Sequence, residues 1–148
     1  MPTAVPLFLV TRDFMTVKIW DMHMERLPVQ TIVVDGRLGP SLHELYESDC
    51  IFDKFDVTLS SDGSKVVTGC YNNEFKVWST KDGELLSYVD LALADRAFDN
   101  SRLSVALPSG ARANYPLSGF DQKILHCNYH PCEGTLSVAG RTGLYLFD

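Results

Sequence analysis

Three segments of the chain share one pattern of apolar and polar positions. Each has a short apolar run, a polar or glycine-containing turn, and a second, alternating run that closes on a large aromatic residue. The closing runs are Val17–Asp21, Phe75–Ser79 and Leu144–Asp148. Alternation with a period of two on both sides of a turn is typical of a β-hairpin. The sequence therefore predicts three hairpins, in which Trp20, Trp78 and Phe147 are packing residues at equivalent positions.

The second and third segments also match upstream of the hairpin. In each, a further apolar run leads into a polar turn, and the spacing from Gly63 to Gly69 equals that from Gly134 to Gly140. A series of short strands and turns ending in an aromatic residue is typical of a WD40 β-propeller blade, which repeats about every 40–45 residues. We therefore expect an all-β chain that forms part of a WD40-type β-propeller, about two and a half blades of it.

Two insertions separate the repeats and set the expected organisation. The expected parts are the end of one blade (1–33), an inserted helix and loop (34–54), a blade (55–87), a long loop (88–122) and the last blade (123–148). Leucines at helical spacing after Gly39 and Pro40 predict a short helix over about 41–47. The second insertion lacks a sustained period between 95 and 118, which favours a surface loop.

Composition narrows the function classes. The net charge of −6 and the lack of a basic stripe argue against a nucleic-acid partner. No apolar run approaches the length of a membrane span, and the first residues lack the pattern of a signal peptide. Four irregularly spaced cysteines do not suggest a disulfide framework, so we expect a reducing setting, cytoplasmic or nuclear.

The sequence offers little support for a catalytic or a metal-binding site. There is no glycine-rich phosphate loop and no Gly-x-Ser-x-Gly turn, so we expect no enzymatic activity and no cofactor. Asp49 and Asp53 are the nearest approach to an acid–base pair. Four residues, His126, Cys127, His130 and Cys132, raise the question of zinc. Because alternate residues of a strand point to opposite sides, we expect no metal site there.

The acidic segment Tyr46–Phe55 carries the main functional hypothesis. In and beside this segment, between positions 44 and 56, there are five carboxylates and one cation, Lys54; the carboxylates are those of Glu44, Glu47, Asp49, Asp53 and Asp56. Carboxylates bind Arg side chains, and the Tyr46 ring offers a face on which Arg can stack. We expect a surface that binds basic protein segments, with Glu47 and Asp49 as its main acceptors. The alternative is a solvated loop with a structural helix. Within the segment, Asp53 could equally cap a turn, and we expect Ile51 and Phe52 to lie in the core rather than in a contact.

Four stretches give the chain a specific resemblance. They are Arg12–Asp21, Leu45–Phe55, Thr68–Asn73, and Lys123–His126 together with Tyr129–Pro131, and in this order they resemble the B-family WD-repeat regulatory subunits of protein phosphatase 2A. Departures include Ser48, the run Asp35–Arg37 and the loop 95–118. The resemblance implies that the chain corresponds to the C-terminal portion of a seven-bladed propeller.

The same resemblance implies a non-catalytic adaptor. Members of this family bind the phosphatase scaffold and catalytic subunits and present basic substrate segments through an acidic groove on the top face. The matching positions here are Tyr46, Glu47, Asp49 and Lys54. The family's earlier blades and scaffold-gripping hairpin have no counterpart in this sequence, so holoenzyme assembly by this chain alone is not implied. A generic WD-repeat interaction scaffold with unrelated partners remains the alternative.

Overall fold

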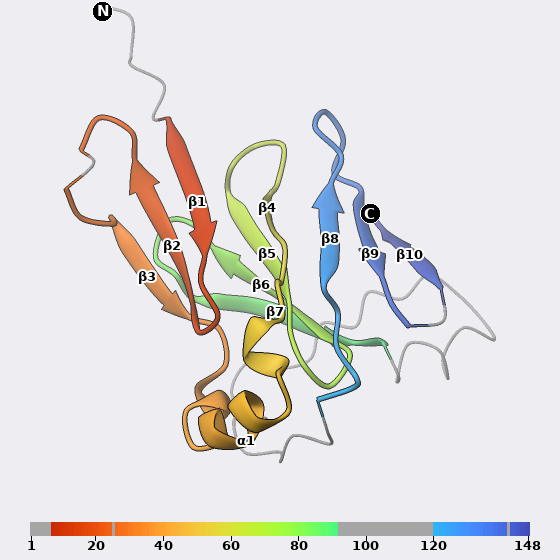
Figure 1. The fold of residues 1–148 in the computed structure, drawn as a ribbon. Coiled ribbons are helices and arrows are strands. Elements are labelled where there is room, and N and C mark those ends of the chain that lie inside the picture. The colour runs from red at the N-terminus through yellow and green to blue at the C-terminus, as the bar shows by residue number, and fades with distance from the viewer. Residues whose placement is uncertain (1–6, 25, 92–119, 142) are drawn as a thin grey trace, which may run out of the picture.

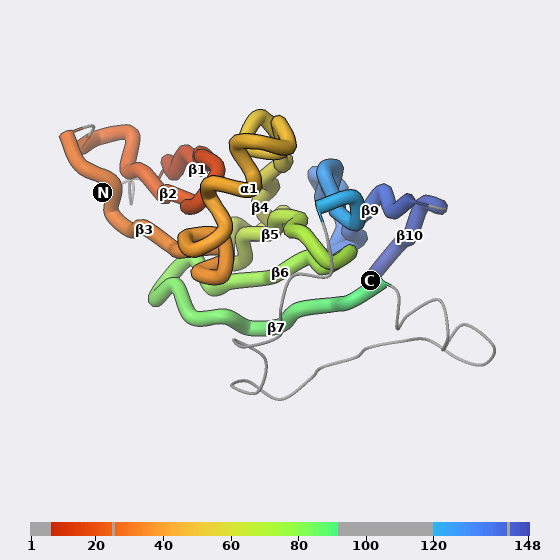
Figure 2. Tube along the Cα trace, turned by 60° about the horizontal axis from the view of Figure 1, so that its bottom comes forward, coloured from red at the N-terminus to blue at the C-terminus, as the bar shows by residue number. Residues whose placement is uncertain are grey.

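The computed structural model describes residues 7–24, 26–91, 120–141 and 143–148, which form three antiparallel sheets. The first contains β1 (Phe8–Arg12), β2 (Thr16–Asp21) and β3 (Gln30–Val33) in that order. The second contains β4 (Val57–Leu59), β5 (Lys65–Gly69), β6 (Glu74–Ser79) and β7 (Leu85–Asp90). The third contains β8 (His126–Tyr129), β9 (Leu136–Ala139) and β10 (Leu144–Phe147). The sheets lie side by side, as Figures 1 and 2 show.

The strand registers confirm the three predicted hairpins. Trp20 lies opposite Leu9, Trp78 opposite Val66, and Phe147 opposite Leu136. Trp78 is buried, and the Phe147 ring packs edge-on against Phe75 of the second sheet at 5.0 Å between centroids. The predicted all-β class with a short inserted helix is therefore confirmed, and the side-by-side antiparallel sheets agree with blades of a WD40-type β-propeller.

One predicted boundary needs correction at the end of the second sheet. The blade was expected to end at residue 87 and a loop to start at 88, but β7 continues to Asp90. Val89 faces the apolar core between the second and third sheets, which explains why the strand continues. The rest of the predicted loop lies outside the described residues, except for 91 and 120–122.

Two apolar cores join the three sheets. One lies between the first and second sheets and includes Ile19 and Val66, and the other lies between the second and third and includes Val67 and Val138. A close approach at Gly69 brings the second and third sheets together. A Cβ atom there would lie 2.0 Å from the carbonyl oxygen of Ile124, so the contact requires glycine.

Three short helices connect the first sheet to the second. They are η1 (Gly36–Leu38), α1 (Leu42–Glu47) and η2 (Cys50–Phe52). In Figure 1 they lie at one end of the sheets, between the end of β3 and the start of β4. In the described part of the chain, no helix is both long enough and apolar enough to cross a membrane.

Candidate functional site

The helix α1 is held on the sheets by its apolar side. Leu45 is fully buried, together with Leu38 of η1, against the rings of Phe55 and Tyr71. Phe55 and Tyr71 meet edge to face at 5.1 Å between ring centroids. Of the leucines at helical spacing in the sequence, Leu38 and Leu45 are buried, whereas Leu42 is 38% exposed, so the pattern predicts the helix but only part of its buried face.

Three of the four predicted site residues follow one another on the exposed side of this insertion. Tyr46 and Glu47 are the last residues of α1; Tyr46 is 65% exposed, and so is the side chain of Glu47. The Glu47 carboxylate lies 3.2 Å from Nε2 of His43, one helical turn earlier. Asp49 is exposed after the end of α1. Lys54, the fourth residue, is also exposed and lies beyond the end of η2.

Asp49 has a left-handed backbone conformation, with φ at 59°. Its amide donates to the carbonyl of Tyr46 at 3.2 Å, and its own carbonyl accepts from the amide of Phe52 at 3.3 Å. Asp and Asn adopt this conformation at lower cost than most other residues. Asp49 is therefore suited both to the sharp turn between α1 and η2 and to the presentation of a carboxylate.

Phe52 is exposed, with 70% of its surface accessible, so its predicted place in the core is wrong. Ile51 is partly buried. Phe52 is the last residue of η2, three positions after Asp49, and both residues are exposed. The exposure of Phe52 depends on η2, a short helix that was not predicted from the sequence.

Asp53 has surroundings opposite to those of Asp49. Its carboxylate accepts a hydrogen bond from the Tyr71 hydroxyl at 2.7 Å, and both its oxygens lie 2.7 Å from Nζ of Lys123. Burial and the hydrogen bond to Asp53 raise the pKa of Tyr71 well above its ordinary value. Asp53 is therefore bound to residues of two other parts of the chain, rather than capping a local turn.

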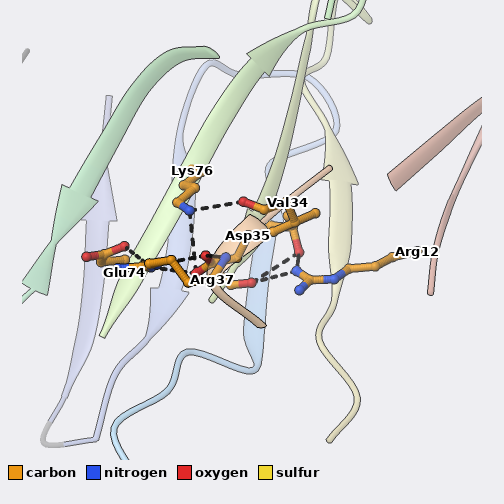
Figure 3. Close-up of polar contacts among 8 residues, drawn as sticks. Arg12, Val34, Asp35, Arg37, Glu74 and Lys76 are labelled. Atoms are coloured by element: carbon orange, nitrogen blue, oxygen red, sulfur yellow. Dashed lines mark hydrogen bonds and ion pairs between the residues drawn. The ribbon is translucent and has the colours of Figure 1, made fainter. Parts of the chain in front are cut away.

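A buried charge cluster holds the other end of the insertion (Figure 3). The cluster consists of Asp35, Arg37, Glu74 and Lys76. Nε of Arg37 donates to Asp35 at 2.7 Å, and Nη2 of Arg37 donates to Glu74 at 3.2 Å. Nζ of Lys76 donates to the carbonyl of Val34 at 3.0 Å. These contacts join the residues just before α1 to strand β6.

The two carboxylates of the cluster have pKa values shifted in opposite directions. Burial by itself raises the pKa of Asp35, but the hydrogen bonds of Arg37 and the charges of Lys76 and Arg37 outweigh it and hold that pKa below its ordinary value. For Glu74, burial outweighs Arg37 and Lys76, so its pKa lies above its ordinary value. Asp35 is thus the better-paired carboxylate of the two.

The residues considered for zinc do not converge. His126 is exposed and its Nδ1 lies 2.9 Å from Asp56, whereas Cys127 is buried, where burial raises its pKa to about 12. The alternation expected from the sequence is therefore present. Within the described ranges, no group of three or more His, Cys, Asp or Glu residues is arranged to hold a metal ion.

Comparison with known proteins places this geometry in context. The chain is 36% identical, over 144 residues, to the B gamma isoform of the 55 kDa regulatory subunit of serine/threonine-protein phosphatase 2A from Rattus norvegicus and from Mus musculus. It is 35% identical over 147 residues to the protein phosphatase PP2A 55 kDa regulatory subunit of Drosophila melanogaster. Each match covers 95% of this chain but only 32%, 32% and 29% of the relatives. The chain thus spans about a third of their length.

The other comparisons add little. No model of a protein family matches the sequence. Among solved structures, the β-propeller domain of Cps50 (Swd1) from Myceliophteria thermophila matches 95% of this chain and 35% of that chain, with a TM-score of 0.45 and 13% identity. The names of the sequence relatives describe regulatory subunits, in agreement with the prediction that the chain is not an enzyme.

Proposed function

Because 95% of the chain matches the 55 kDa regulatory B subunits of protein phosphatase 2A at 35–36% identity, we propose that it belongs with them over the part that it spans and is a non-catalytic regulator of this phosphatase. In this proposal it associates with the scaffold and catalytic subunits and recruits substrates to them. The support is homology over 95% of the chain to proteins named as regulatory subunits.

We further propose that the substrates are basic protein segments that bind the exposed side of the acidic segment. One observation carries this proposal: Tyr46, Glu47, Asp49 and Phe52 are all exposed, on consecutive turns of backbone. Carboxylates attract Arg and Lys, while the two rings offer apolar area and a face for cation–π contact. This combination fits a segment that carries both basic and apolar residues.

Asp53 and Asp56 are left out of the proposed contact surface, Asp53 because it has a largely buried cationic partner and Asp56 because it lies beyond η2, outside the turn that carries Asp49. Asp53 is paired with Lys123, and Asp56 lies 2.9 Å from Nδ1 of His126. Lys54 would repel a basic segment at short range. We therefore propose that it contributes to specificity, by disfavouring segments whose cations lie close to it, rather than to attraction.

The binding proposal is tested with a helical peptide built from Arg, Lys and Leu, whose affinity is measured by fluorescence anisotropy at low and moderate salt. Asp49→Asn keeps a residue that tolerates positive φ and removes the charge, which makes it cleaner than Asp49→Lys. We expect Asp49→Asn to weaken binding by up to about fivefold, since an exposed ion pair contributes about 0.2–1 kcal/mol. Asp49→Lys adds repulsion and is expected to weaken binding further.

The matched control is Glu84→Gln, which removes one exposed negative charge from the β6–β7 turn, at the opposite end of the second sheet. An equal effect of Glu84→Gln and Asp49→Asn would show that only net charge matters and would contradict a site at Asp49. Association with the phosphatase is tested separately, by capture of the purified scaffold and catalytic subunits on the immobilised chain. Peptide binding without such capture would favour a generic interaction scaffold.

A further inference from the structure

Both ends of the insertion 34–54 bind to one element, the β5–β6 turn. At its start, Arg37 donates to Glu74, which begins β6. At its end, the Tyr71 hydroxyl donates to the Asp53 carboxylate at 2.7 Å and to the carbonyl of Cys50 at 3.2 Å. Tyr71 and Glu74 are thus the two ends of a single tight turn that touches both ends of the insertion.

The turn itself is well fixed. Asn72 and Asn73 have φ values of 62° and 54°, the conformation that a two-residue hairpin turn requires. The amide of Cys70 donates to the carbonyl of Glu74 at 2.7 Å, and the amide of Ile124 donates to the carbonyl of Cys70 at 3.0 Å. The turn is therefore held by its own sheet and by the segment that leads into the third.

Lys123 completes this arrangement from the third part of the chain. It forms an isolated bridge with Tyr71 and places Nζ 2.7 Å from both carboxylate oxygens of Asp53. The Asp53 and Lys123 side chains are 15% and 24% exposed, so water screens this pair less than a surface pair. Tyr71 and Lys123 together determine where Asp53 lies, and Asp53 ends the short helix that follows Asp49.

We propose that Tyr71, Lys123 and Glu74 are positioning residues, which hold the insertion at both ends so that Tyr46, Asp49 and Phe52 are presented in one arrangement. This inference rests on the proposed function, in which that side of the insertion binds basic segments. A surface ordered before binding loses less conformational entropy when a partner arrives, so affinity depends on residues that never touch the partner.

If Lys123 acts only through its charge, Lys123→Met should raise the affinity for the peptide; if Lys123 holds Asp53 in place, the same substitution should lower it. This substitution removes a positive charge close to the acidic segment, and electrostatics alone would then strengthen binding of the Arg, Lys and Leu peptide. Displacement of Asp53, and with it of the turn that carries Asp49 and Phe52, would instead weaken peptide binding. We expect binding to weaken severalfold in Lys123→Met, and also in Tyr71→Phe, which removes one hydroxyl without a change of charge. Lys123→Arg keeps the charge and is expected to restore binding to within about twofold of the unaltered chain.

A second measurement does not depend on peptide binding. The amides of Phe52 and Asp53 donate to Asp49 and Cys50 within the turn, so their hydrogen exchange reports its order. We expect exchange of these two amides to become faster in Tyr71→Phe and Lys123→Met, well below the unfolding temperature. The amide of His130, which donates to Thr135 in the β8–β9 connection, is the internal control and is expected to stay unchanged.

The outcomes separate the inference from the proposed function. Unchanged exchange at Phe52 and Asp53 overturns the inference whether or not the peptide binds. Faster exchange with tighter binding in Lys123→Met also overturns it, because order would then be irrelevant to affinity. Absence of peptide binding by the unaltered chain overturns the proposed binding role, and exchange then decides whether these residues hold the segment. Faster exchange together with weaker peptide binding, in both Tyr71→Phe and Lys123→Met, supports the positioning inference and the proposed binding role.

Discussion

The buried charge cluster and the exposed acidic segment contain the same kind of side chain in opposite roles. Asp35 is 3% exposed and lies against Arg37 and Lys76, whereas Asp49, in the same insertion, faces solvent. In the cluster, cations of the chain itself bind the carboxylates. In the acidic segment, carboxylates remain accessible to a cation from outside. The difference teaches that a count of acidic residues does not identify a binding surface until internal partners are known.

The largest expected effect on stability comes from a substitution in the buried charge cluster. Arg37→Met removes the guanidinium that binds both Asp35 and Glu74 and leaves Lys76 as the one remaining cation of the cluster, in a site from which water is largely excluded. We expect a loss of roughly 3 kcal/mol in the free energy of unfolding, measured by urea denaturation.

Lys18→Met is the matched control for that experiment. It removes a cation from the ion pair with Asp13, where the two side chains are 32% and 49% exposed. An exposed pair contributes less than about 1 kcal/mol. A cost as large for Lys18→Met as for Arg37→Met would show that burial does not set the difference between the two classes of ion pair.

An intermediate effect is expected in the pH dependence of stability. The pKa of Asp35 is lower in the folded than in the unfolded chain, so its contribution is complete above its ordinary value of 3.8 and is lost as the pH falls through the folded value. We expect carbon NMR of the Asp35 carboxyl to show titration below pH 3.8 in the unaltered chain. In Arg37→Met, titration should move to higher pH; an unmoved midpoint would contradict the pairing.

Glu74, in the same cluster, is expected to give a pH dependence of stability opposite in sign to that of Asp35. Its pKa is raised on folding, so its contribution to stability is complete below its ordinary value of 4.5 and is lost as the pH rises through the folded value. Glu74→Gln removes this loss. The difference in unfolding free energy between Glu74→Gln and the unaltered chain should therefore shift in favour of the variant between pH 4.5 and neutrality, whatever its absolute size. A constant difference across this range would contradict the raised pKa.

The smallest effect is expected on the exposed side, at the pair formed by His43 and Glu47 on α1. Both side chains are largely exposed, and pairs at this spacing stabilise a helix by about 0.2–0.5 kcal/mol at most. His43→Gln should change the free energy of unfolding by no more than this amount. A larger loss, measured in the same urea experiment, would mean that this pair supports the fold.

The sequence predicted the hairpins because their signals are local. Alternation around Trp20 and Trp78, the turn at Asn72 and Asn73, and leucine spacing around Leu45 each depend on neighbours within a few residues. The same holds for exposure of Glu47 and Asp49, which follows from their places on and after α1.

Contacts between residues far apart in the sequence could not be predicted from such local signals. Arg37 and Glu74 are 37 positions apart, and nothing near either residue shows that the charge of one is satisfied by the other. Asp53 was grouped with Asp49 because both lie in one acidic run, while its partner Lys123 lies in another part of the chain. Phe52 was placed in the core because it is apolar, although the short helix η2 turns it outward.

The ion pair between Asp53 and Lys123 also has a consequence for the order of folding. The two residues are separated by 70 positions, whereas the hairpins form between strands only a few residues apart. Closing so long a stretch of chain costs more entropy, and contacts of this range form late in most small domains. We expect the second sheet to form first and the acidic segment to reach its final shape only when Lys123 arrives. A newly made chain would then acquire the proposed binding surface only after its hairpins have formed.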